Sequence, residues 1–232
     1  MLEVRGLWKT YAHAGGPVHA LRDVSLSAPA GAFVTVAGPS GAGKTTLLLA
    51  LGGLLRPSSG EIRFGDRRID AMDDAALAAF RRDDVGFVMQ NFSLVPYLTA
   101  AGNVILPLRL QGVGREERRA RAHEALRTLG LEGRESHLPR ELSAGQQQRV
   151  AIARATVTHP RLVLADEPTG NLDPELARDI LAELRRLNAE RGMTIVMVTH
   201  SPEAAAMGSV RLRMRRGAID SPAGSQAPVP VA

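Results

Sequence analysis

The sequence contains no cysteine, few aromatic residues and no long apolar run, and each absence narrows its possible functions. Without cysteine among its 232 residues, the chain can form neither disulfides nor thiolate metal sites. Only eight residues are aromatic, and none alternates with basic residues as stacking platforms for single-stranded nucleic acid do, so we expect no nucleic-acid partner. The longest apolar candidate, residues 47–55, is far shorter than the roughly 20 residues that span a bilayer, so no direct membrane insertion is expected.

Lysine is also scarce, because only two of the 29 basic residues, Lys9 and Lys44, are lysines. The net charge of +5 could indicate nucleic acid or an anionic membrane surface, but we attribute it to a compositional bias toward arginine. Residues 1–4 lack the basic start and apolar stretch of a signal peptide, so a cytoplasmic location is expected. The length suffices for one large domain with a core of its own.

A glycine-rich stretch that reads G-x-x-x-x-G-K-T lies between a strand-like run and a helix-like run, residues 33–37 and 47–55. Glycines let several backbone N–H groups point at a phosphate, while the following helix directs its positive end to the same place. A glycine-rich turn followed by Lys-Thr by chance is disfavoured by this strand-and-helix context. Lys44 can reach the β- and γ-phosphates, and the Thr45 hydroxyl can ligate Mg²⁺. The predicted nucleotide-binding residues are Gly38, Pro39, Ser40, Gly41, Ala42, Gly43, Lys44, Thr45 and Thr46.

The patterning of the chain predicts an α/β fold, and the phosphate loop makes that fold similar to the P-loop NTPase (RecA-like) type. Alternation at residues 2–7 and 18–28 indicates an N-terminal antiparallel β-subdomain. The runs expected as buried strands of a parallel sheet are residues 33–37, 85–89, 162–165 and 194–199. The stretches expected as helices are residues 73–82, 118–129, 150–156 and 174–190. Helical periodicity predicts an α-helical subdomain at about residues 92–158, inserted between core segments 1–91 and 159–220 of one domain, 1–220; the Pro/Ser/Ala-rich tail, 221–232, is predicted to be disordered.

Two acidic residues, Asp166 and Glu167, follow the apolar run at residues 162–165 directly. In phosphate-loop enzymes a carboxylate at this strand end faces the loop and holds Mg²⁺, usually through water, which predicts that role for Asp166. Glu167 would then reach the γ-phosphate region and could orient and polarise an attacking water. An Asp-Glu pair alone is more often a solvated turn, but the phosphate loop upstream favours the functional interpretation.

A second candidate anion site is the sequence Leu-Ser-Ala-Gly-Gln at residues 142–146, which precedes a predicted helix. It offers a hydroxyl, backbone N–H groups and the positive end of a helix dipole. Ordinary N-capping explains Ser143 but not Gly145 followed by three glutamines. His200 follows the last buried run; a lone histidine is usually structural, but at the carboxyl end of a parallel strand a functional role is favoured.

Together these motifs resemble the ATP-binding subunit of an ABC transporter, and the resemblance covers about residues 2–216. The matching motifs, in the order that the family shows, are Walker A (38–46), the glutamine loop (Gln90), the signature motif (142–146), Walker B (162–166) with Glu167, the D-loop (171–173) and the switch residue His200. The amino-acid sequences at residues 85–92, 103–108 and 164–173 resemble those of the subgroup that powers lipoprotein release, macrolide export and antimicrobial-peptide resistance. The cell-division ATPase of the same subgroup is similar to this chain too. The signature departs from the usual pattern by having Ala144 in place of glycine.

The resemblance implies a role for each matching residue. Tyr11 would stack on adenine, and Gln90 would contact Mg²⁺ or the attacking water and sense a membrane partner. The residues implied to act on the γ-phosphate of an ATP held by a second copy are Ser143, Gly145 and Gln146. The residues implied in catalysis are Lys44, Gln90, Glu167 and His200, and those implied at the metal are Thr45, Gln90 and Asp166.

The expected function is therefore an ATP-hydrolysing subunit with ATP and Mg²⁺ as cofactors. A head-to-tail homodimer would close around two ATP molecules and drive a separate transmembrane permease, in export or in extraction from the membrane. The chain would lie peripherally on the inner face of the cell membrane through that partner. The alternative is an ATP-driven regulator without transport that acts through a membrane protein, as in cell division. ATPases of DNA repair and of ribosomes are disfavoured, because the chain has neither a long coiled-coil insertion nor a second cassette.

Overall fold

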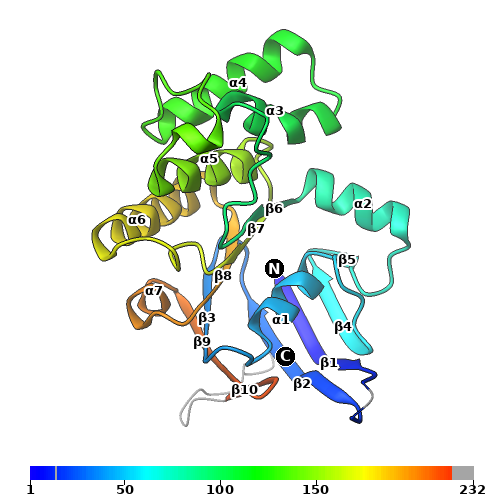
Figure 1. The fold of residues 1–232 in the computed structure, drawn as a ribbon. Coiled ribbons are helices and arrows are strands. Elements are labelled where there is room, and N and C mark those ends of the chain that lie inside the picture. The colour runs from blue at the N-terminus through cyan, green and yellow to red at the C-terminus, as the bar shows by residue number, and fades with distance from the viewer. Residues whose placement is uncertain (14, 221–232) are drawn as a thin grey trace.

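Two β-sheets form the framework of this computed structural model, which describes residues 1–13 and 15–220 (Figure 1). The smaller sheet has the strand order β2-β1-β4-β5, with β1 (Leu2–Tyr11), β2 (Val18–Ala28), β4 (Ser59–Phe64) and β5 (Arg67–Arg68). All of its pairings are antiparallel, which confirms the predicted N-terminal antiparallel sheet. Leu2 and Val4 of β1 are buried because alternate side chains of a strand share one face.

The larger sheet has the order β10-β9-β3-β8-β7-β6 and is mostly parallel. Its strands are β3 (Phe33–Ala37), β6 (Val85–Val88), β7 (Leu162–Asp166), β8 (Thr194–Thr199), β9 (Val210–Arg215) and β10 (Ala218–Asp220). Only β10 runs antiparallel, against β9. All four predicted buried strands are present. Every residue of β7 and β8 is buried, as expected where helices cover both faces of a parallel sheet.

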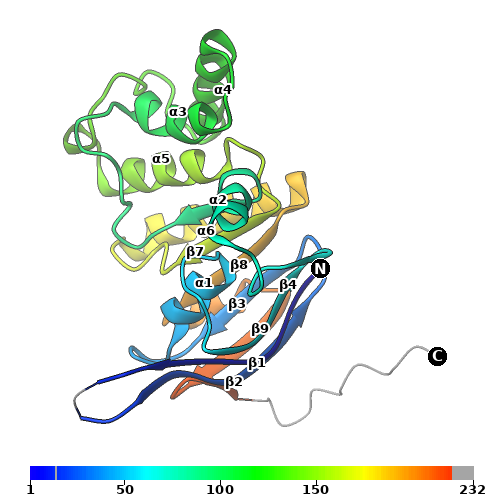
Figure 2. The ribbon, with the colours of Figure 1, turned by 90° about the vertical axis from the view of Figure 1, so that its right-hand side faces the viewer.

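Helix α1 (Lys44–Leu51) packs between the two sheets. Its apolar side chains share one hydrophobic cluster with the antiparallel sheet and with one face of the larger sheet. A second cluster, on the opposite face, includes apolar residues of α3, α4, α5 and α6. Consecutive residues of β7 alternate between them, because Leu164 belongs to the first cluster and Val163 and Ala165 to the second. Figure 2 shows this layering, with the helices of the second layer at the end away from β1 and β2.

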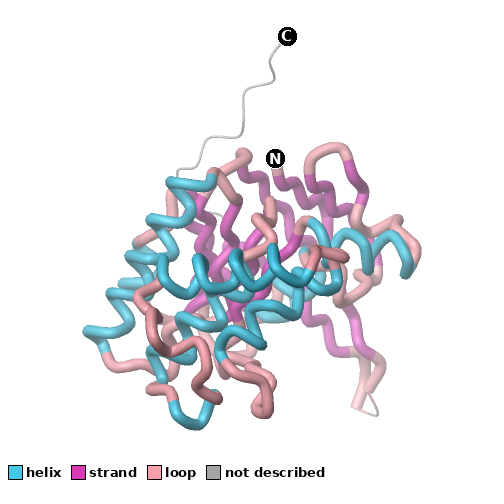
Figure 3. The backbone as a smooth tube through the Cα atoms, turned by 90° about the horizontal axis from the view of Figure 1, so that it is seen from above, coloured by secondary structure: helices cyan, strands magenta, loops and turns pink. Residues whose placement is uncertain are grey.

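The chain between β6 and β7 contains α3 (Ala100–Leu110), α4 (Arg115–Thr128), the short 3-10 helix η1 (Pro139–Glu141) and α5 (Ala144–Thr156). No strand occurs in residues 89–161, so the predicted fold class, an α/β core with a helical insertion, is confirmed. The view from above, Figure 3, shows these helices lying over the strands. The remaining helices are α2 (Asp74–Asp83), α6 (Pro174–Arg191) and α7 (Pro202–Ala206).

The predicted helical run at residues 47–55 is wrong at its carboxyl end, because α1 stops at Leu51. Gly52 caps the helix and Gly53 follows with a φ of 65°, a left-handed conformation that glycine adopts at little cost. The predicted disordered tail, 221–232, lies outside the described residues. Within the described part of the chain, no helix combines the length and the apolar character needed to cross a bilayer.

Candidate functional site

Four neighbouring strands of the larger sheet deliver the predicted site residues to one edge. β3, β8, β7 and β6 are adjacent and parallel, so their carboxyl ends meet at the same side. β3 leads into the phosphate loop, β7 ends at Asp166, β8 is followed by His200, and Gln90 comes two residues after β6. This edge is where open α/β sheets place their ligands. The topology therefore joins segments that are far apart in the sequence.

The glycine-rich loop passes so close to β2 that one of its residues has no room for a side chain. Gly43 has a φ of 97°, and a Cβ there would lie 2.3 Å from the Ala20 carbonyl oxygen. Beyond it, the first turn of α1 has neither a side-chain cap nor an acidic residue. The buried Lys44 ammonium donates to the Gly38 and Pro39 carbonyl oxygens at 2.9 and 3.1 Å. The loop thus combines a fixed cation with uncapped N–H groups, as a phosphate site requires.

The loop borders a cavity of about 450 Å³. The predicted residues that line it are Ser40, Gly41, Ala42, Gly43, Lys44, Thr45, Thr46, Gln90, Asp166 and Glu167. The lining residues that the sequence did not predict are Val18, His19, Ala20, Arg22, Arg216 and Gly217. Two of these are arginines, which add positive charge at the cavity. They belong to no motif and meet because the Arg22 backbone N–H donates to the Gly217 carbonyl oxygen at 2.8 Å, so only the folded chain identifies them.

Thr45 and Asp166 form a pair of oxygen donors beside the loop. The Thr45 hydroxyl donates to Asp166 Oδ1 at 3.2 Å. The pKa of the Asp166 carboxyl is raised above its usual value. Burial is the largest cause and the charge of Glu167 adds to it, while the hydrogen bond from Thr45 acts in the opposite direction. No cluster of three or more His, Cys, Asp or Glu side chains that could hold a metal occurs in the residues described. A hydroxyl and one carboxylate nonetheless fit Mg²⁺, which keeps several waters and shares its shell with substrate phosphates.

The Glu167 carboxylate lies between the side chains of His200 and Lys44. Its Oε2 lies 2.5 Å from His200 Nδ1, and its Oε1 lies 3.5 Å from Lys44 Nζ. The backbone of Glu167 has a φ of 45°, a strained conformation for a residue with a side chain. Its N–H donates to the Val198 carbonyl oxygen at 3.0 Å. The structure therefore brings Lys44, Glu167 and His200 together from three different segments.

The predicted signature residues lie at the start of α5 and do not line this cavity. Ser143 and Gln146 form a capping box, in which the serine hydroxyl accepts from the Gln146 N–H at 3.3 Å and the Gln146 side chain accepts from the Ser143 N–H at 3.0 Å. Ser143 is exposed, whereas Gly145 is buried. A Cβ on Gly145 would lie 2.5 Å from Leu176 Cδ2 of α6, so a side chain there would have to displace the Leu176 side chain.

Tyr11 also lies apart from the cavity. It ends β1 and is 43% exposed, with the Lys9 ammonium 5.1 Å from the centre of its ring. It is not among the lining residues, so its adenine-stacking role stays a prediction.

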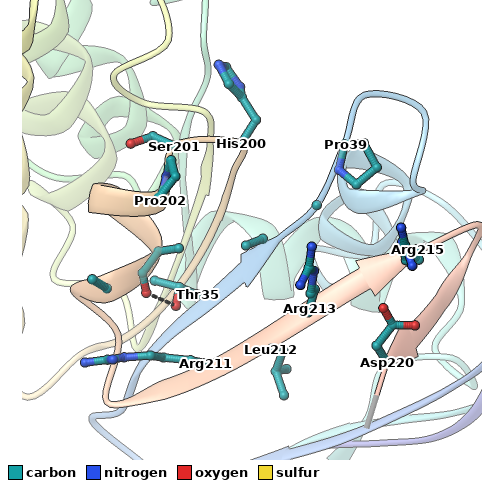
Figure 4. Close-up of a pocket in the computed structure, with 14 residues that line it drawn as sticks. Thr35, Pro39, His200, Ser201, Pro202, Arg211, Leu212, Arg213, Arg215 and Asp220 are labelled. Atoms are coloured by element: carbon teal, nitrogen blue, oxygen red, sulfur yellow. Dashed lines mark hydrogen bonds between the residues drawn. The ribbon is translucent and has the colours of Figure 1, made fainter. Parts of the chain in front are cut away.

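A larger groove of about 960 Å³ lies on the other side of the loop (Figure 4). Pro39 and His200 border it, and Arg213 and Arg215 of β9 rise from the same strand into it. Its lining includes neither Lys44, the Thr45–Asp166 pair nor Glu167. Size alone would favour this groove, but the smaller cavity holds the groups that can bind and cleave a phosphate chain.

Comparisons with known proteins agree with this geometry. A family model described as ABC transporter matches residues 21–170. The chain is 43% identical over 226 residues to the macrolide export ATP-binding/permease protein MacB 1 of Yersinia pestis, covering 97% of this chain and 35% of that protein, so it spans about a third of that relative. It is 44% identical over 219 residues to the lipoprotein-releasing system ATP-binding protein LolD of Geobacter metallireducens, covering 94% of this chain and 97% of that protein.

Solved structures give the same answer. A dimeric structure described as a post-hydrolysis state of the ATP-binding cassette MJ0796 bound to ADP and Pi has a TM-score of 0.88 and 41% identity, covering 95% of this chain and 97% of that one. A second dimeric structure of that cassette has a TM-score of 0.89 and 42% identity over the same shares. The chain belongs to the ABC transporter family, and it is an ATP-binding ATPase cassette of that family.

Proposed function

We propose that the chain hydrolyses ATP with Mg²⁺ at the cavity beside the phosphate loop and uses the energy to drive a membrane-bound transport partner. The observation that carries this proposal is the placement of the Glu167 carboxylate, 2.5 Å from His200 Nδ1 and 3.5 Å from Lys44 Nζ, beside the phosphate loop. A carboxylate in this place can orient a water and accept its proton as it attacks the terminal phosphate. Phosphoryl transfer also needs binding of the phosphate chain and neutralisation of its charge, and neighbouring groups would supply both.

In this mechanism the loop N–H groups and Lys44 bind the phosphate chain and counter its charge. Thr45 and Asp166 would hold Mg²⁺, which supplies further charge neutralisation, and Gln90 lines the same cavity and would contact the metal or the water. His200 orients the Glu167 carboxylate through their short hydrogen bond and would contact the terminal phosphate. The position of each side chain supports its proposed role, and a single substitution can test each of these side chains.

The start of α5 is a second candidate anion site on the same chain, and its distance from the cavity is consistent with a site shared between two copies. Ser143 is exposed at the first turn of α5 but does not border the cavity beside the loop. In a head-to-tail pair, the α5 terminus of one copy would face the phosphate loop of the other and complete its site. The solved relatives described as dimeric support this arrangement. ATP would then hold the two copies together until hydrolysis releases them.

The partner would dock on an apolar groove of about 540 Å³ between the core and the helical layer. Two of its lining residues are large exposed hydrophobics, Leu54 at 53% and Leu110 at 72%. Met89 lines this groove, and its neighbour Gln90 lines the cavity beside the phosphate loop. A partner that moved Met89 would therefore also move Gln90, because the two residues are adjacent in the chain. Exposed apolar grooves of this kind fit a partner segment with an apolar face. Binding there would place the chain peripherally on the cytoplasmic face of a membrane, and the names of its relatives favour export or extraction.

The substitution Glu167→Gln tests the proposal. Without a base, ATPase activity should fall by at least about 100-fold, while ATP binding persists and an ATP-dependent dimer accumulates. Phosphate release and size-exclusion chromatography with light scattering measure both outcomes. Glu190→Gln is the matched control, since this α6 carboxylate forms an ion pair with Arg186 on the surface, 3.1 Å away. Activity in the Glu167 variant equal to that of the control would overturn the assignment of the base.

A further inference from the structure

Gln148 is a completely buried amide that reaches from α5 to the loop after β7. Its Nε2 donates to the Pro168 carbonyl oxygen at 2.6 Å. Its Oε1 is buried too and has no hydrogen-bond partner within residues 1–13 and 15–220. Burying an amide oxygen without a partner costs about as much as one hydrogen bond gains, so the amide adds little net stability over an apolar side chain of the same shape. Stability alone therefore does not explain why a glutamine occupies position 148.

The carbonyl group that Gln148 holds belongs to Pro168, the residue after the strained Glu167. Glu167 has a φ of 45°, and such a backbone persists only where its surroundings fix it. Three hydrogen bonds do so. The Glu167 N–H donates to the Val198 carbonyl oxygen at 3.0 Å, the Glu167 carbonyl oxygen accepts from the Gly170 N–H at 3.0 Å, and the next carbonyl oxygen, that of Pro168, accepts from Gln148. Of these, only the last comes from a side chain.

We propose that Gln148 is a positioning residue of the ATPase reaction, which holds the Glu167 carboxylate in place by anchoring the Pro168 carbonyl oxygen. The inference rests on the proposed role of Glu167 as the base. Gln148 is well suited to this task because it lies on a helix packed into the second hydrophobic cluster, and a rigid element places a reacting group more precisely than a loop does. Displacement of a reacting group by about 1 Å can cost on the order of 100-fold in rate.

Gln148→Met tests this role, because methionine keeps the volume and loses the donor. The kcat for ATP hydrolysis should fall by about 10- to 100-fold, while the Kd for a fluorescent ATP analogue changes less than about threefold. The matched control is Thr156→Val on the same helix, which removes a buried hydrogen bond from Thr156 Oγ1 to the Ile152 carbonyl oxygen, 2.9 Å long, away from the loop. Thermal unfolding of both variants separates loss of positioning from loss of fold.

A double variant distinguishes positioning of Glu167 from a purely structural role of Gln148. If Gln148 acts only through Glu167, adding Gln148→Met to Glu167→Gln should lower single-turnover hydrolysis no further. A multiplicative loss in the double variant, or a kcat for Gln148→Met equal to that of Thr156→Val, would overturn the inference. The proposed function fails separately, if Glu167→Gln alone leaves hydrolysis unchanged.

Discussion

Ser143 and Gly145 are two residues apart, yet they differ in what a substitution can reveal. A Cβ on Gly145 would contact the Leu176 side chain, so a replacement there shifts a side chain between α5 and α6 as well as changing the exposed surface. Ser143 is exposed, and its hydroxyl accepts from the Gln146 N–H in the capping box of its own helix. Its removal costs about 1 kcal/mol of stability as an N-cap and otherwise leaves the chain intact. Ser143 is therefore the better probe of a site shared between two copies.

Ser143→Ala should impair hydrolysis while leaving ATP binding by the dilute monomer largely unchanged. Lys44→Ala should weaken both, because the Lys44 ammonium lies on the phosphate loop of its own chain. Equilibrium binding of a fluorescent ATP analogue at concentrations below dimerisation, compared with ATPase rates, distinguishes the two. Equal loss of monomer binding in both variants would contradict the shared site.

The sequence predicted the cavity-lining residues that belong to contiguous motifs, but it did not predict those outside the motifs. Lys44, Thr45, Asp166 and Glu167 have short spacings to a strand end, and the structure gathers them at one cavity. Arg216 reaches the same cavity only through the packing of the β9–β10 turn against β2, which local patterning does not encode. The predicted roles of these residues in binding and catalysis stay predictions until the variants are measured.

Helix starts differ in a way that bears on function. α2, α3, α5, α6 and α7 each begin with a side chain that accepts from the first turn. α4 lacks such a cap but has two glutamates in its first turn, and only α1, among the helices of the described chain, has neither device. Its first N–H groups are thus left for an anion. Sequence patterning found α2 and α6, because Asp73 and Asp173 are strong start signals. It gave no bounds for α3 and no helix at α7, and it missed β9, although the alternation of apolar residues and arginines in β9 is typical of a half-buried strand.

Helix α3 is tied to the segment before it by one side chain, Asn103. This fully buried amide accepts from the Val95 N–H at 2.8 Å and donates to the carbonyl oxygens of Val95, Leu98 and Thr99 at 3.1–3.2 Å. Asn103→Ala should lower the free energy of unfolding by about 2–3 kcal/mol, because several buried backbone groups lose their partner. Urea denaturation measures this.

The control for Asn103 is Gln111→Ala at the other end of α3, where an exposed amide donates to the Arg82 carbonyl oxygen at 3.2 Å. That change should cost less than about 0.5 kcal/mol. A loss of similar size in both variants would show that Asn103 does not hold the segment.

In the described part of the chain, two hydrophobic clusters lie on opposite faces of the larger sheet, and the cavity beside the phosphate loop lies at the edge of that sheet. The apolar groove that contains Leu54 and Leu110 lies where the core meets the helical layer. A partner in this groove would touch both layers at once. The second hydrophobic cluster already joins these two layers, because it contains residues of α3, α4 and α5 together with residues of the larger sheet.

Leu110→Glu should weaken association with the membrane partner while leaving the basal ATPase activity unchanged, because a charge placed in an apolar groove opposes docking. Ala120→Glu, an exposed position on α4 outside the groove, is the control. Recovery of membrane protein with the tagged chain, and stimulation of its ATPase by membranes, measure the effect. Equal recovery with the two variants would place the docking surface elsewhere.

The strand order of the larger sheet also determines when its strands can pair during synthesis. β3, which leads into the phosphate loop, lies between β8 and β9, and both neighbours come late in the chain. During synthesis β3 therefore emerges with both of its backbone edges unpaired, and they stay so until residues 194–215 have followed. The strands β1 and β2, close in sequence, pair without that delay. An apolar strand with open edges is prone to wrong pairing, so the segment on which nucleotide binding depends is also the one most exposed to misassembly before the chain is complete.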